Sequence, residues 1–176
     1  MVYRTAERFE EALRKIAKEQ EAGSKHAIEG LPVLPDLRVA LDVAAADLRP
    51  LVVLYSKDEK ERARMRELVR PAAWSEKFVG RLRYVVVDDS KELEAFEGLM
   101  IEPGVSVVQA EAYGRGGRVL AHAGPRAPEK NLSEALKSGL GRFDAEAKNV
   151  RDHLRTGERE GIEWESAIPV SDPGRR

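Results

Sequence analysis

The hydrophobic pattern of the chain centres on an unbroken apolar run, Leu51–Tyr55, followed by a polar turn. A short apolar run rich in β-branched residues predicts a strand that is buried on both faces. The charged stretch Asp58–Arg70 comes next and predicts a helix with one apolar side. A buried strand that leads into a helix is typical of α/β folds, whose chemistry lies in the loops at strand carboxyl ends.

Apolar residues at three- and four-residue spacing predict further helices on both sides of this strand. These helices are Tyr3–Glu21, Asp36–Leu48, Ala72–Val79, Leu132–Leu140 and Phe143–Leu154. Pro71 is expected to kink or end the helix that begins at Asp58, because proline lacks the amide donor of a helix interior. Trp74 and Phe78 are expected to fill the core. Ser90 is expected to cap a short helix that contains Leu93 and Phe96.

Three more segments predict strands. Leu82–Val87 is a second buried strand, and Val105–Tyr113 alternates in part, as a strand with one exposed face does. Gly114–Gly117 then predicts a hairpin turn, with Arg118–Ala123 returning as an antiparallel strand. A phosphate-binding glycine loop joins a strand to a helix, whereas these glycines join two strands, so we interpret them as a hairpin.

The segments divide the chain into three parts. Residues 1–30 form an N-terminal amphipathic helix extension, 31–143 the α/β domain, and 144–176 a C-terminal helix with a mobile tail. The apolar stripe of the first helix packs on the domain, or it contacts a partner or a second copy of the chain. The pattern alone leaves both interpretations open.

Charge and composition narrow the classes of partner. The formal net charge is −1, so no global field attracts nucleic acid or an anionic membrane. Arg115, Arg118 and Arg126 make one region basic, but without interleaved aromatic residues they are weak evidence for nucleic-acid binding. No apolar run reaches the roughly 18–20 residues that a membrane helix needs. Met1–Arg8 has no apolar signal core, which predicts a cytoplasmic protein, although a secreted chain without its signal would look the same.

The absence of cysteine excludes disulfides, thiol catalysis and thiolate metal sites. The three histidines, His26, His122 and His153, lie far apart in the sequence and show no ligand spacing, so we expect neither a metal nor a cofactor. Asp88 and Asp89 follow a predicted strand, where paired carboxylates often act in catalysis or metal binding. We favour the simpler interpretation, in which one aspartate caps the next helix and the other is solvated.

The order of elements resembles the thioredoxin-like fold over about Asp36–Phe143, which implies a central mixed sheet flanked by helices. Leu51–Tyr55 resembles the central strand that leads into the redox turn of that superfamily, and Tyr84–Asp89 resembles its next parallel strand. Ile101-Glu102-Pro103 resembles the loop whose proline is cis and faces the active site. The closing hairpin of that superfamily and the glycine after it have counterparts in this chain, which are Val105–Val108, Gly116–Gly117, Val119 and Gly124.

The chain departs from the family at the position of the redox turn. Ser56–Arg62 contains no cysteine, and disulfide exchange requires a thiolate that attacks sulfur. The resemblance therefore implies a redox-inactive member that binds proteins or peptides. Such folds can hold an extended peptide beside the proline loop. The residues expected to border this groove are Tyr55, Ser56, Lys57, Asp58, Glu102 and Pro103.

Two alternative functions remain open. In the first, the protein is an enzyme of another class that uses Ser56, Asp58 and the Asp88–Asp89 pair, with His122 as the base. In the second, the protein is a scaffold or assembly subunit, and the charged helix faces Glu59–Arg70 and Glu129–Lys137 supply its surface.

Overall fold

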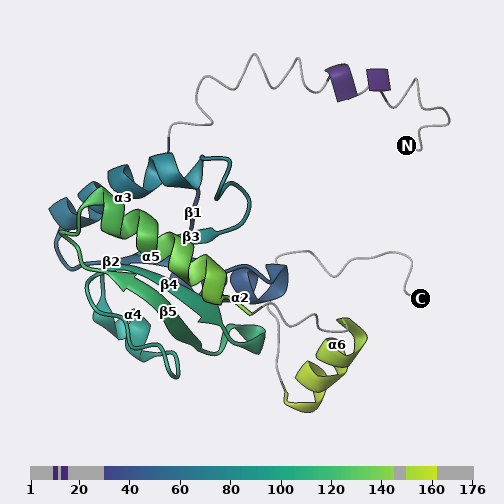
Figure 1. The fold of residues 1–176 in the computed structure, drawn as a ribbon. Coiled ribbons are helices and arrows are strands. Elements are labelled where there is room, and N and C mark those ends of the chain that lie inside the picture. The colour runs from purple at the N-terminus through teal and green to yellow at the C-terminus, as the bar shows by residue number, and fades with distance from the viewer. Residues whose placement is uncertain (1–9, 12, 16–29, 145–149, 162–176) are drawn as a thin grey trace.

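Helices cover both faces of a five-stranded mixed sheet (Figure 1). The computed structural model describes residues 10–11, 13–15, 30–144 and 150–161 of the chain. The elements follow in the order β1 (Val33–Leu34), α2 (Leu37–Asp47), β2 (Leu51–Tyr55), α3 (Glu59–Ala73), β3 (Arg83–Val87), α4 (Ser90–Glu94), β4 (Gly104–Ala110), the 3-10 helix η2 (Ala112–Gly114), β5 (Gly117–Ala123), α5 (Glu129–Arg142) and α6 (Val150–Arg159). The α/β class and the helix-flanked mixed sheet expected from the sequence are confirmed.

The strands lie in the order β1-β3-β2-β4-β5, so β2 is the central strand. β1 and β2 both run parallel to β3, whereas β4 runs antiparallel to β2 and to β5. Every residue of β2 is buried, as its unbroken apolar run predicts. The pairing of Tyr55 with Gly104 brings the carboxyl end of β2 and the amino end of β4 to the same end of the sheet.

Two apolar cores lie on opposite faces of the sheet. Alternate residues of β2 separate them, because successive strand side chains point to opposite faces. Val52 and Leu54 join the core under α3 and α5, and Val53 joins the core under α2 and α4. The helices therefore form one layer on each side of the sheet (Figure 1).

Three aspartates begin the helices that follow strands or turns. The Asp36 carboxylate accepts a hydrogen bond from the Val39 amide at 2.8 Å, and the Asp58 and Asp89 carboxylates accept from the amides two residues onward at 2.9 Å. Each bond satisfies an amide that has no partner within its helix. The cap of α4 is therefore Asp89, and the prediction of Ser90 as the cap is wrong, because Ser90 is the first residue inside the helix.

The helix over Ala72–Val79 that the sequence predicts does not form. Instead α3 continues past Pro71 to Ala73, and turns follow it. Pro71 lies within three residues of the end of α3, so the hydrogen bond lost through its missing amide proton affects only the last turn of the helix. Phe78 is buried as expected, but Trp74 is 40% exposed, and its indole Nε1 donates a hydrogen bond to the Gly30 carbonyl at 3.0 Å.

The hairpin connection is longer than the glycine pattern predicts. β4 ends at Ala110, and the loop contains η2, in which Tyr113 adopts a left-handed conformation with φ of 66°. A β-carbon at Gly114 would collide with the Asp42 side chain on α2, so the glycine allows the loop to pack directly against that helix.

The C-terminal helical segment differs from its predicted bounds. α5 ends at Arg142, because Phe143 has an extended backbone, and α6 runs beyond the predicted end to Arg159. The N-terminal prediction Tyr3–Glu21 is described only at residues 10–11 and 13–15, where the chain is helical. The rest of that helix, its role in dimerisation and the tail after residue 161 lie outside the described residues.

Candidate functional site

The end of the central strand brings several of the predicted site residues together. We call Tyr55–Glu59 the strand-end turn; Pro103 lies next to it, because Gly104 pairs with Tyr55. Tyr55 and Ser56 are buried, whereas Lys57, Asp58, Glu102 and Pro103 are exposed. All peptide bonds of the described residues are trans, that of Glu102–Pro103 included. The prediction of a cis peptide bond before Pro103, which the resemblance implies, is therefore wrong.

Hydrogen bonds at Ser56 close the strand-end turn. The Ser56 hydroxyl donates to Glu61 Oε2 at 2.8 Å and accepts from the Asp58 amide at 3.1 Å. Arg62 Nη1 donates to the Ser56 carbonyl at 2.7 Å. Each polar group of Ser56 that faces α3 therefore has a partner.

Arg62 is a buried cation that holds this turn to its surroundings. Its guanidinium contacts the carboxylate of Glu59 and lies 3.7 Å from Asp88 Oδ2. The second carboxylate oxygen of Glu61 lies 3.2 Å from Arg126 Nε. A buried charge is costly without such partners, so the contacts of Arg62 stabilise this turn.

The two aspartates after β3 have ordinary structural roles. Asp89 caps α4, as described above, and Asp88 is 65% exposed at the side chain with Arg62 as its partner. The interpretation of one cap and one solvated carboxylate is confirmed, with the addition of the Arg62 contact. Within the described ranges, no cluster of three or more His, Asp or Glu residues is arranged to hold a metal ion.

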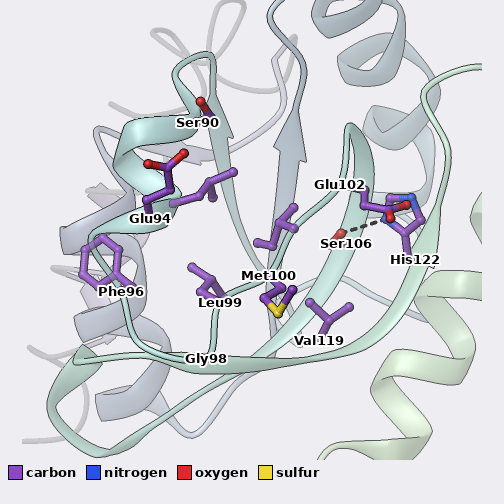
Figure 2. A pocket seen from close by; sticks show the side chains of 12 residues that line it. Ser90, Glu94, Phe96, Gly98, Leu99, Met100, Glu102, Ser106, Val119 and His122 are labelled. Carbon is purple, nitrogen blue, oxygen red and sulfur yellow. Dashed lines mark hydrogen bonds between the residues drawn. The ribbon is translucent and has the colours of Figure 1, made fainter.

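A pocket of about 620 Å³ lies between α4, the loop after it and the β4–β5 sheet face (Figure 2). We call it the α4 pocket. Its apolar lining comes from Leu93, Phe96, Leu99, Met100, Ile101 and Val119. The side chain of Met100 is 89% exposed. Of the six residues expected to border a groove, Glu102 alone lines this pocket.

The sequence interpretation missed the apolar part of the pocket. Leu99-Met100-Ile101 is an apolar triplet in an otherwise acidic loop, with no helical or alternating period to bury it. Such a triplet outside any regular element is the signal that could have identified the site, since core residues normally follow the period of a helix or strand.

His122 faces the α4 pocket but has a different partner from the one that a catalytic interpretation requires. Its Nδ1 lies 2.9 Å from the hydroxyl of Ser106, which is opposite it on β4. Ser56 is bonded to Glu61 instead. Ser106 is completely buried at the base of the pocket, and its hydroxyl orients the imidazole. The structure therefore does not assemble Ser56 and His122 as a nucleophile and its base.

Glu92 on α4 lies in a strongly acidic environment. Partial burial, followed by the charges of Asp88, Asp89 and Asp36, raises the pKa of Glu92. A carboxyl whose pKa is raised on folding stabilises the protein below its unfolded pKa, and this contribution is lost as the pH rises through the folded pKa. Ionised Glu92 therefore destabilises the folded state at neutral pH.

We expect Glu92→Gln to raise the free energy of unfolding at pH 7 by about 0.3 kcal/mol, a small value because solvent screens exposed charges. The gain should vanish at about pH 3.5, where a glutamate is protonated in the unfolded state. Urea titration at both pH values measures the difference, with Glu76→Gln as a control on the opposite side of the sheet. An equal gain at both pH values would contradict the electrostatic explanation.

No helix among the described residues is long and apolar enough to cross a membrane. No protein-family model matches this chain, and neither a curated protein nor a solved structure shows significant similarity to it.

Proposed function

We propose that this protein is a redox-inactive member of the thioredoxin-like superfamily that binds an extended segment of a partner protein in the α4 pocket. The sheet supports the superfamily assignment, because β2 is central, β3 runs parallel to it, and an antiparallel hairpin closes the other side.

The strand-end turn supports the loss of redox activity. The chain has no cysteine, so it contains no group that can form a mixed disulfide. In addition, Ser56 is buried and bonded to Glu61 and Arg62. A substrate would have to displace these hydrogen bonds to reach Ser56. The strand-end turn therefore has a structural role.

The observation that carries the binding function is the exposed Met100 beside an apolar pocket of about 620 Å³. Pockets of this size are typical of ligand sites. A thioether side chain adapts to varied apolar surfaces, and burying one leucine-sized side chain of a partner contributes about 1.5–3 kcal/mol. Glu102 lines the pocket and also belongs to the loop beside which the resemblance implies a peptide groove, and this supports the proposal.

Peptide display on the purified protein tests this proposal. We expect a random peptide library to yield binders whose affinity, measured by fluorescence anisotropy, falls about tenfold in Met100→Asp, because a carboxylate would replace the apolar contact. Val79→Asp is the matched control, since Val79 is 48% exposed and lies in the turns after α3. Failure to enrich any peptide, or equal loss in both variants, would contradict the proposal.

A further inference from the structure

We propose that the α4 pocket recognises a peptide in which cationic residues flank an apolar residue. This inference rests on the proposed function and adds the chemistry of the partner. The apolar residue would fill the middle of the pocket, and lysine or arginine side chains would meet carboxylates at its ends.

The segment that builds the pocket is far more acidic than the chain as a whole. The whole chain has a net charge of −1, yet residues 88–102 contain a single basic residue, Lys91, and six carboxylates: Asp88, Asp89, Glu92, Glu94, Glu97 and Glu102. Among the parts of the chain that the structure describes, only Asp88 of these six forms an ion pair with a basic side chain. Burial is the largest cause of the raised pKa of Glu92, and the neighbouring carboxylates Asp88, Asp89 and Asp36 add to it.

Two of these carboxylates, Glu94 and Glu102, line the pocket, and they lie at its separate ends. Figure 2 shows Glu94 with Ser90 at one end, on α4, and Glu102 with His122 at the other, beside β4 and β5. Leu99, Met100 and Val119 lie between these ends (Figure 2). A ligand that spans the pocket therefore passes from a negative end over an apolar surface to a second negative end.

This arrangement selects the charge of the peptide. An acidic peptide would place like charges together, which costs free energy on binding. Lysine or arginine would instead meet Glu94 and Glu102, which form no ion pair with any basic side chain in the described ranges. Nδ1 of His122 is hydrogen-bonded to the Ser106 hydroxyl. The other ring nitrogen, Nε2, is therefore the one that can contact a ligand at this end of the pocket. Apolar burial would supply affinity, and the two acidic ends would supply specificity.

A series of three fluorescent dodecapeptides tests the inference on the full chain. The first has a central leucine–phenylalanine pair with two lysines on each side, the second has glutamates in place of the lysines, and the third keeps the lysines but has serines at the centre. We expect the first peptide to bind at least about tenfold more tightly than either of the others at low salt, and its affinity to fall as salt screens the charges.

Charge-reversal variants identify the residues responsible. In Glu94→Lys/Glu102→Lys, we expect the basic peptide to lose about tenfold in affinity and the acidic peptide to gain. Glu76→Lys/Glu134→Lys makes the same change in net charge on exposed residues in the turns after α3 and on α5, and it should leave the preference unchanged. Urea unfolding of each variant confirms that it is folded.

The possible outcomes separate the two proposals. Equal binding of the basic and acidic peptides would overturn the charge assignment, and the peptide-binding function would stand. Equal effects of the two double variants would also overturn it, because the charge would then act globally. Absence of binding by all three peptides, together with an unenriched display library, would overturn both the charge assignment and the proposed function.

Discussion

Replacing Gly139 by alanine is expected to lower the free energy of unfolding by about 2 kcal/mol, even though alanine favours a helix by about 1 kcal/mol over glycine. At Gly139, α5 packs directly against Val107 of β4. A β-carbon there would collide with Val107 Cβ and would lie 2.5 Å from Val107 Cγ1 and 2.8 Å from Cγ2. Val107 is completely buried on a central part of the sheet, so it has no free space into which to move.

The same helix supplies the control for this prediction. A β-carbon at Gly141 would meet nothing within 4 Å, so Gly141→Ala should keep or slightly raise the stability. Urea denaturation of both variants at 25 °C gives the comparison. Val107→Ala should rescue little of this loss, because the atom nearest to the added β-carbon is Val107 Cβ, which alanine keeps. If Gly139→Ala were as stable as Gly141→Ala, the close approach of α5 to the sheet would be wrong.

Replacing Arg62 by methionine is expected to cost about 2 kcal/mol, the range of hydrogen bonds that involve a charged group. Methionine would fill a similar volume. The Ser56 carbonyl would lose its hydrogen-bond donor, and the carboxylates of Glu59 and Asp88 would lose their ion-pair partner. Both carboxylates are largely exposed and can be solvated, so we expect a smaller loss than for a fully buried pair.

Arg66→Met on the same helix is the matched control, since Arg66 is exposed, and it should change stability by less than about 0.5 kcal/mol. Chemical denaturation of both variants measures the difference. Amide hydrogen exchange at Ser56 and Asp58 adds a local measurement, because loss of Arg62 should increase exchange in the strand-end turn. Equal stability of the two variants would show that the buried guanidinium does not hold the turn.

The central part of the fold could be predicted because its residues obey a single period. Leu51–Tyr55 is apolar at every position, and a strand buried on both faces is the simplest structure that accommodates such a run. The helix α2 begins and ends within one residue of its predicted bounds, since Asp36 caps it and Arg49–Pro50 cannot continue it.

The errors arose where tertiary contacts decide between local alternatives. Trp74 is apolar enough for the core, but its indole reaches the Gly30 carbonyl, which is distant in the sequence. Ser90 and Asp89 are both good caps, and only the backbone geometry selects Asp89. Pocket-lining residues such as Met100 and Val119 come from separate segments, so no local pattern could have placed them together.

The outer edge of β5 has a consequence for how copies of this protein meet one another. The register shifts between Val107 and Val108, so Leu120 has no partner residue on β4, and its carbonyl accepts a hydrogen bond from Arg142 Nη1 at 2.8 Å. An added strand needs an uninterrupted row of free carbonyls and amides. Open-ended pairing of sheets into fibrils through this edge is therefore disfavoured.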